Sequence, residues 1–250
     1  MVEQVADKVF RVGGSSVNCY IAREGRQLTL FDTGYPHDAA RLEDAIRQLG
    51  HRVEDVQAVL LTHAHVDHSG GLNRLWDAYR IPVYMHPLEV AIARGLRHEQ
   101  ATPWDVARRI WKPRVALWCR HVVQAGGTQP VAITHARAFP RAGALDLPGS
   151  PVPVHCAGHT SGHTAYLLAD SGALITGDAL NTGHAISSRV GPQVLPGYFS
   201  QDPKHAYLTL DRLAREDADL MLPGHGLPWR GELARAVAEA REHAPRAFRP

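Results

Sequence analysis

The 250-residue sequence has little net charge, few cysteines and no long apolar segment. Its 27 Lys and Arg residues against 25 Asp and Glu give a formal net charge of +2, too small to indicate nucleic acid as the main partner. No segment approaches the roughly 20 uninterrupted apolar residues of a membrane span. The N-terminal segment also lacks the apolar core of a secretory signal. We therefore expect a cytoplasmic protein that has neither a nucleic acid nor a membrane as partner.

Only three cysteines are present, Cys19, Cys119 and Cys156, and their spacing forms no disulfide framework. A reduced compartment is the simpler interpretation. The residue type in excess is histidine, of which there are sixteen. This excess favours metal binding but does not by itself locate a site.

Strand and helix signals alternate along the chain and predict an α/β fold. Apolar runs at 27–31, 56–61, 81–85, 152–156, 164–169, 173–176 and 218–222 predict strands. Amphipathic stretches at 39–49, 71–79, 203–214 and 232–243 predict helices. Polar residues and histidines follow the strand ends, which is where open α/β sheets usually bind ligands.

The strongest local signal is His63-x-His65-x-Asp67-His68, which directly follows the apolar run at 58–61. His63 and His65 are two residues apart, so they lie on the same side of an extended segment. Asp67 and His68 turn the other way. Four ligand groups at this spacing can serve two neighbouring metal ions.

With four further motifs, this cluster resembles the metallo-β-lactamase superfamily. The motifs are Phe31-Asp32-Thr33-Gly34, Gly158-His159-Thr160-Ser161-Gly162-His163, Thr176-Gly177-Asp178 and Pro223-Gly224-His225-Gly226. The resemblance covers nearly the whole chain. It implies an αββα sandwich, in which two mixed sheets are flanked by helices, as a single domain over residues 1–250.

The resemblance also implies a set of seven metal ligands. One metal ion is expected at His63, His65 and His159, the second at Asp67, His68 and His225, with Asp178 bridging both. In having aspartate at the bridging position, the sequence resembles glyoxalase II and related thioesterases and lactonases. One large group of true β-lactamases has cysteine at the corresponding position. We expect two Zn²⁺ ions per chain, and the nitrogen and oxygen donors also suit iron or manganese.

Three polar residues outside this ligand set have expected roles, and one of the ligands has a second role. Asp32 follows a strand near the cluster and is expected to orient a ligating imidazole. Asp67 is expected to be a ligand and also the carboxylate that handles the proton in catalysis. Asn181 and His184 come shortly after the expected bridge, so both are candidates for contact with substrate.

A basic helical insert is expected at about 88–125. Between residues 94 and 120, seven Lys and Arg residues face two acidic ones, a local excess of +5. Trp104, Trp111 and Trp118 recur every seven residues there, on one helical stripe unless Pro113 interrupts it. Two interpretations stay open, an aromatic face packed on the core and a basic, aromatic lid over the site. The charge excess favours an anionic substrate, such as an acyl thioester on a phosphopantetheine arm.

These observations together predict a dinuclear-metal-dependent hydrolase. A hydroxide bridging the two metals is expected to attack the carbonyl of a thioester, a lactone or another ester or amide, carried by a small molecule or an acyl carrier. The chain ends about 25 residues after His225, which counts against the C-terminal extension of a true glyoxalase II. The alternatives are a mononuclear iron persulfide dioxygenase of the same superfamily and a true β-lactamase. One iron per chain would favour the dioxygenase, and two zinc ions would exclude it.

Overall fold

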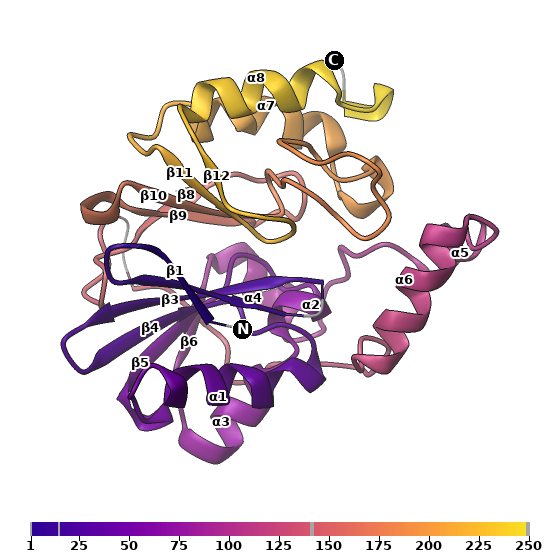
Figure 1. Ribbon diagram of the computed structural model, residues 1–250. Helices are drawn as coiled ribbons and strands as arrows, with labels where there is room; N and C mark the ends of the chain where they lie inside the picture. The colour runs from indigo at the N-terminus through magenta and orange to yellow at the C-terminus, as the bar shows by residue number, and fades with distance from the viewer. Residues whose placement is uncertain (1, 15, 141–142, 249–250) are drawn as a thin grey trace.

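The computed structural model describes residues 2–14, 16–140 and 143–248. Two β-sheets stack face to face, and helices cover their outer faces (Figure 1). This arrangement is the αββα sandwich expected from the sequence motifs, and both sheets are mixed.

The N-terminal sheet contains seven strands in chain order. They are β1 (Val2–Ala6), β2 (Val9–Gly13), β3 (Asn18–Glu24), β4 (Gln27–Phe31), β5 (Val56–Leu60), β6 (Val83–Met85) and β7 (Arg137–Ala138). Strands β1 to β4 pair antiparallel, and β4 to β7 pair parallel. The parallel strands β4 and β5 therefore end at the same edge of the sheet, where the first histidine cluster follows β5.

The C-terminal sheet contains five strands in the order β12-β11-β10-β9-β8. Their bounds are β8 (Val152–His155), β9 (Thr164–Leu168), β10 (Ala173–Gly177), β11 (Leu220–Pro223) and β12 (Trp229–Arg230). Of these five strands, β10 and β11 pair in parallel and the others antiparallel, so β10 and β11 also end at a common edge.

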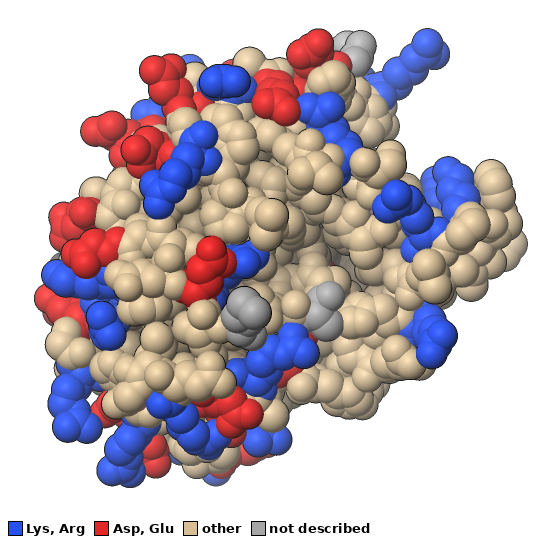
Figure 2. All heavy atoms as spheres, in the orientation of Figure 1, with Lys and Arg blue, Asp and Glu red and all other residues tan. Residues whose placement is uncertain are grey.

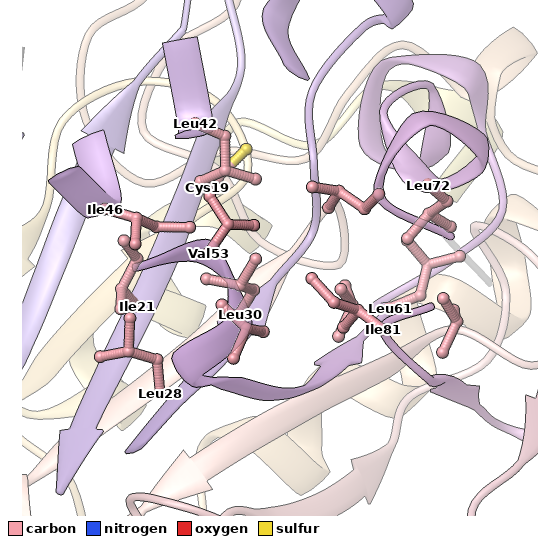
Figure 3. Close-up of a cluster of buried hydrophobic side chains, with 14 of the residues drawn as sticks. Cys19, Ile21, Leu28, Leu30, Leu42, Ile46, Val53, Leu61, Leu72 and Ile81 are labelled. Carbon is pink, nitrogen blue, oxygen red and sulfur yellow. The ribbon is translucent and has the colours of Figure 1, made fainter. Parts of the chain in front are cut away.

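Two helix layers bury one apolar face each. Helices α1 (Ala39–Gln48), α3 (Leu72–Tyr79) and α4 (Pro87–Ala93) pack on the N-terminal sheet, and α7 (Pro203–Leu213) and α8 (Leu233–Glu242) pack on the C-terminal sheet. On α1, the buried Leu42 and Ile46 are four residues apart and therefore lie on one face of the helix. This face packs in the same apolar cluster as Leu30 of strand β4 (Figure 3). Helix α1 stops where expected, because Gly50 adopts a positive φ of 79° that ends the helix without strain.

A third apolar layer lies between the sheets and joins them. It includes Tyr20, Phe31 and Leu60 from the N-terminal sheet and Tyr166 and Ile175 from the C-terminal sheet. The Phe31 and Tyr166 rings lie 5.5 Å apart, centroid to centroid. Because this layer is closely packed, the strand ends of the two sheets are held opposite each other at one edge of the sandwich.

The expected insert forms α4, α5 (Pro103–Ala107) and α6 (Pro113–Gln124), and the last two project from the sandwich (Figure 1). We call residues 102–124 the arm. Trp104 and Trp111 are 68% and 75% exposed, so the interpretation that the tryptophan stripe packs on the core is wrong for these two residues. The three tryptophans do not share one helical face, because α5 ends at Ala107 and α6 begins only at Pro113, with Trp111 in the turn between them. Trp118 turns inward instead, with its ring 5.6 Å from that of Phe199.

Two arginines tie the arm to the C-terminal half of the chain. The Arg109 guanidinium lies 4.0 Å from the centre of the Tyr198 ring, and Arg114 donates to the Ser187 carbonyl at 3.1 Å. Across the described residues, no helix has the length and apolar character needed to cross a bilayer.

Candidate metal centre

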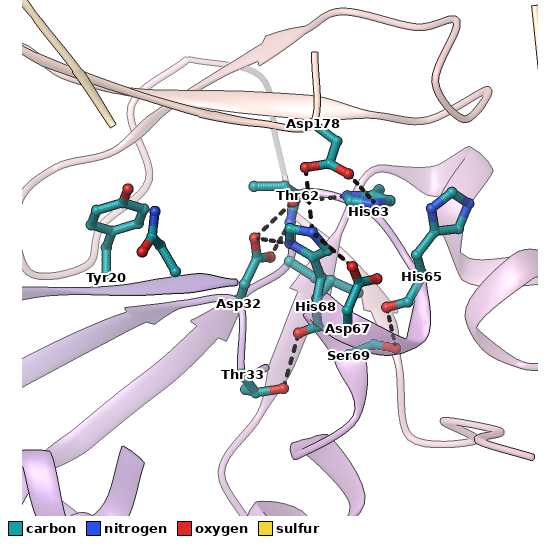
Figure 4. Close-up of polar contacts among 12 residues, drawn as sticks. Tyr20, Asp32, Thr33, Thr62, His63, His65, Asp67, His68, Ser69 and Asp178 are labelled. Carbon is teal, nitrogen blue, oxygen red and sulfur yellow. Dashed lines mark hydrogen bonds and ion pairs between the residues drawn. The ribbon is translucent and has the colours of Figure 1, made fainter. Parts of the chain in front are cut away.

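The seven predicted ligands converge at the edge where the strands of both sheets end. Figure 4 shows five of them, His63, His65, Asp67, His68 and Asp178. His63 and His65 follow β5, and Asp67 and His68 lie in the short helix α2 (Val66–Ser69). From the other sheet, His159 follows β8, Asp178 follows β10 and His225 follows β11. Each sheet therefore contributes part of one side-chain cluster.

One group of donor atoms consists of three imidazoles. The ligand atoms of His63, His65 and His159 all lie within 4.8 Å of one another. His159 Nε2 is 3.0 Å from His65 Nδ1, so the two nitrogens face the same point. All three side chains are buried.

A second group lies beside the first and includes a carboxylate. The donor atoms of Asp67, His68 and His225 also lie within 4.8 Å of one another. The Asp67 carboxylate is 3.5 Å from His225 Nε2 and 4.0 Å from His68 Nε2.

The Asp178 carboxylate lies between the two groups. Its Oδ2 atom is 3.5 Å from His159 Nε2 and 4.0 Å from His63 Nε2. Its Oδ1 atom is 3.5 Å from His68 Nε2 and 3.3 Å from His225 Nε2. Each oxygen therefore faces a different group, which is the arrangement a bridging carboxylate requires.

The donor set fits divalent metal ions. Among the described residues, none hydrogen-bonds the buried Nε2 atoms of His63, His68 and His225, although buried polar atoms are almost always paired. Two ligands about 2.1 Å from a tetrahedral zinc ion lie about 3.4 Å apart, and most of the gaps around Asp178 are close to that value. The fold and these histidine and aspartate groups thus imply a divalent metal.

Asp32 hydrogen-bonds one of these imidazoles. Its Oδ2 atom accepts a hydrogen bond from His68 Nδ1 at 2.8 Å. The other ring nitrogen of His68, Nε2, therefore points toward Asp67 and His225. Asp32 also accepts from the backbone N–H and the hydroxyl of Thr62, both at 2.8 Å. The buried carboxylate therefore has three donors, and it keeps a proton on Nδ1 of His68.

Backbone carbonyls orient two other imidazoles. His65 Nε2 donates to the Glu99 carbonyl at 2.8 Å, and His225 Nδ1 donates to the Ser16 carbonyl at 2.7 Å. In both cases the other ring nitrogen turns toward the cluster. The loop that carries His225 is held by β3, because Asn18 donates to the carbonyls of Pro223 and Gly226 at 2.9 and 2.7 Å.

The two groups differ in their protonation. Burial, reinforced by neighbouring imidazoles, holds the pKa of His63 and of His159 well below the usual histidine value. Burial also opposes protonation of His225, but the carboxylates Asp178 and Asp67 outweigh it and raise the pKa to about 10. Burial opposes protonation of His68 too, but the carboxylates Asp178, Asp32 and Asp67 outweigh it and raise the pKa of this imidazole. The three-imidazole group is therefore neutral and ready for a cation, whereas the second group holds protons that a cation must displace.

Two buried glutamates support the ligand loops, and neither was predicted from the sequence. Glu89 accepts from the backbone N–H groups of Ala64 and Gly162 at 2.9 and 3.0 Å, and from the Thr160 hydroxyl. Glu99 accepts from the Ser161 N–H at 2.6 Å. Burial raises the pKa of Glu89 to about 7. Glu89 thus connects the loop that carries His63 and His65 to the loop that follows His159.

His163 supports the bridge instead of ligating. Its Nε2 atom accepts from the Asp178 backbone N–H at 3.0 Å, so its proton lies on Nδ1, 3.2 Å from the Cys156 sulfur. Burial lowers the pKa of His163 to about 3 and raises the pKa of Cys156 to about 12. Both side chains are therefore neutral, and they position the backbone of Asp178.

The two predicted substrate contacts lie in different places. Asn181 is buried and does not line the cavity described below; its Oδ1 atom accepts from the His225 N–H at 2.8 Å. It therefore positions a ligand loop. His184 does line the cavity, with its ring 4.7 Å from that of His225.

A cavity of about 650 Å³ opens onto the cluster between the sandwich and the arm. Its apolar wall comes from the arm and the facing loops and includes Val106, Ile110, Trp118, Leu195 and Phe199. His65, Asp67, His159, Asp178 and His225 form its polar floor. Among the described residues, no lysine or arginine lines it, so the basic side chains of the insert lie outside the space that a substrate would occupy.

Comparison with known proteins agrees with this geometry. A family model described as the metallo-beta-lactamase superfamily matches residues 12–225. The "Probable metallo-hydrolase YflN" of Bacillus subtilis is 25% identical over 84% of this chain and 79% of its own length. A hydroxyacylglutathione hydrolase of Alkalilimnicola ehrlichii is 31% identical over 72% of this chain, which spans 49% of that enzyme.

Solved structures give the same result. A metallo-beta-lactamase family protein from Thermus thermophilus superposes with a TM-score of 0.65 at 25% identity, over 96% of this chain and 80% of its own. The subclass B3 metallo-beta-lactamase BJP-1 of Bradyrhizobium japonicum has the same fold, with a TM-score of 0.65 at 18% identity over 96% and 90% of the two chains. The chain therefore belongs to the metallo-β-lactamase superfamily and is a metal-dependent hydrolase.

Proposed function

We propose that the chain is a dinuclear zinc hydrolase that cleaves the acyl bond of a thioester, a lactone or a related ester. The observation that carries this proposal is the Asp178 carboxylate, whose two oxygens each face a separate group of donors. When bound, two divalent ions supply an acidified water as nucleophile and an electrophile for the carbonyl oxygen.

The chain's own residues account for proton handling. Asp67 lines the cavity, and although burial opposes ionisation, His68 and His225 keep the pKa of its carboxyl below the usual range. Asp67 is thus an anion at the base of the substrate space, and we assign it the proton of the attacking water. A serine or cysteine nucleophile is not needed, and burial makes the Cys156 thiol inert.

His184 is placed to bind substrate as a neutral donor. Its Nδ1 atom accepts from the Ile186 N–H at 3.3 Å, so its proton lies on Nε2. Burial, together with the nearby His225, lowers the pKa of His184 to about 3, which keeps the ring uncharged. A neutral N–H donor at the cavity wall suits a carbonyl or ring oxygen of the substrate.

The cavity wall favours an apolar acyl group. The basic residues of the insert do not line the cavity, so they give no support to an anionic group inside it. Among the relatives, the hydroxyacylglutathione hydrolase carries a name that denotes acyl hydrolysis, which agrees with a thioester as one substrate class. We accordingly place the acyl part of a small-molecule or carrier-bound substrate against Val106, Ile110 and Phe199.

The test is to assay zinc-loaded protein in parallel against an acyl thioester, an acyl homoserine lactone and a chromogenic cephalosporin. We expect turnover of the thioester or the lactone, with two zinc ions per chain by elemental analysis. His65→Ala and Asp178→Ala should abolish turnover, whereas His205→Ala, at an exposed position on α7, should not. Full turnover in the first two variants would refute the site assignment. One iron per chain with persulfide-dependent oxygen uptake, or turnover of the cephalosporin alone, would replace the proposed function.

A further inference from the structure

The arm carries aromatic side chains that the fold leaves in water. Trp104 and Trp111 are 68% and 75% exposed, and Leu117 on α6 is 66% exposed. Helix α5 ends at Ala107 and residues 108–112 form a turn, so Trp104 on α5 and Trp111 in the turn before α6 are exposed on two neighbouring parts of the arm. Side chains of this size normally contribute to a core or an interface, so their joint exposure marks a binding surface.

The same segment is strongly basic. Between residues 102 and 124, Arg108, Arg109, Lys112, Arg114 and Arg120 face a single acidic residue, Asp105. That carboxylate is already engaged, because it accepts from the Thr102 N–H at 3.1 Å and lies 3.6 Å from Arg108. Figure 2 shows basic side chains gathered over the arm, to the right of the hollow that separates it from the sandwich.

We infer that the arm docks on an anionic lipid bilayer, with Trp104 and Trp111 in the headgroup region and the neighbouring cations on lipid phosphates. Tryptophan prefers the interface between water and hydrocarbon, and lysine and arginine extend their charged ends to the headgroups. Lys112 illustrates the pairing, since its ammonium lies 5.5 Å from the centre of the Trp111 ring. An element of this kind lies on the surface and does not span the bilayer.

Charge decides between a bilayer and a second copy of the chain. A two-fold dimer through the arm would bring the same basic residues of both copies together, which costs free energy when the interface excludes water. An anionic bilayer instead attracts the cations that are exposed and do not tie the arm to the rest of the chain, Arg108, Lys112 and Arg120. Our expectation of no membrane partner depended on the net charge of +2 and the lack of a spanning segment, and neither describes a local surface.

The position of the cavity suggests how membrane docking would serve catalysis. Ile110 and Val123 line the cavity and are also 53% and 60% exposed, so the cavity opens beside the exposed tryptophans. A docked arm would set this opening against the lipid, and an apolar acyl substrate could enter with little exposure to water. This last step rests on the proposed function, whereas the docking itself does not.

Co-sedimentation with vesicles tests the docking without any substrate. We would compare vesicles of phosphatidylcholine alone with vesicles of phosphatidylcholine and phosphatidylglycerol, using the zinc-loaded chain of 250 residues. We expect binding to the anionic vesicles to be at least about tenfold tighter, with a blue shift of tryptophan fluorescence and release by added salt. Equal sedimentation with both vesicles, or none with either, would overturn the inference.

Three variants make the test specific. W104S/W111S should weaken vesicle binding by about tenfold or more, because it removes the two exposed rings. Leu208→Ser, at a 55% exposed position on α7, is the matched control and should bind as the wild type does. Replacing Arg108, Lys112 and Arg120 with glutamine should remove the preference for anionic lipid.

The remaining measurements separate docking from catalysis and from self-association. Turnover of a water-soluble short-chain thioester should be unchanged in W104S/W111S, so failure of the proposed function would be seen independently of vesicle binding. If light scattering shows a dimer that W104S/W111S converts to a monomer, the arm is an interface between copies and the inference is wrong.

Discussion

Replacing Asp32 with asparagine changes one oxygen at the centre of the ligand support to an amide nitrogen. Asp32 is buried and has a positive φ of 60°, a conformation that asparagine tolerates better than most residues, so the backbone should stay as it is. Its Oδ1 atom accepts from the Thr62 N–H, and its Oδ2 atom accepts from both the Thr62 hydroxyl and His68 Nδ1.

Neither orientation of the asparagine amide keeps all three contacts. With the amide oxygen at the Oδ1 position, the NH₂ group faces His68 Nδ1, which must then accept, so the proton moves to the metal-facing Nε2. With the amide reversed, the NH₂ group faces the Thr62 N–H and leaves a buried donor unpaired. Either result costs about 1–3 kcal/mol, or roughly 5- to 150-fold in affinity for one metal ion.

Competition with a chromogenic zinc chelator measures this loss at each site. We expect Asp32→Asn to weaken zinc at the group containing Asp67, His68 and His225 and to leave the three-imidazole group nearly unchanged. Asp170→Asn, at an exposed carboxylate, is the control. Two zinc ions bound by Asp32→Asn with wild-type affinity would show that the Asp32–His68 hydrogen bond does not orient a ligand.

Three further predictions concern protonation and packing. Because the folded pKa of His225 is raised to about 10, zinc affinity at its group should increase as pH rises toward that value. Protonated His225 also stabilises the metal-free protein through its neighbouring carboxylates. This contribution to the free energy of unfolding is complete below about pH 6.5 and should be lost as pH rises through about 10, which denaturant titration at several pH values would detect. Ellman's reagent should label Cys119 in the native protein and reach the buried Cys19 and Cys156 only after unfolding; rapid labelling of all three would contradict the packing. Glu89→Ala should leave three donors unpaired at a cost on the order of 3 kcal/mol, and so lower Tm by about 6–12 °C; an unchanged Tm would remove Glu89 from the loop support.

The sequence predicted those parts of the fold whose signals are local. The apolar run before His63 became β5, and the amphipathic stretch at 39–49 became α1, because periodicity and a terminal glycine determine such elements directly. Strands β1 to β3 were not predicted. They are short antiparallel strands stabilised by their pairing with one another, and pairing is not visible in any single segment.

The residues of the site also fall into those that the sequence identified and those whose role it did not show. The family resemblance named the seven side chains that the structure brings together, which lie in the segments after β5, β8, β10 and β11. The supporting role of Glu89 could not be predicted, since a single glutamate in an amphipathic helix is normally a solvent-exposed residue. Asn181 was expected in the substrate space because it lies near the bridge in sequence. Its actual neighbour, the His225 backbone, is 44 positions away along the chain.

The convergence of ligands from both sheets has a consequence for how the chain folds. The segment after β5 supplies four of the seven donors, and the set is complete only when residue 225 has been synthesised. A bound ion is therefore a reversible cross-link between two halves of the molecule, and its strength grows with the logarithm of the free metal concentration. A shortage of the metal would then weaken the contact between the two halves at the same time as it lowers turnover.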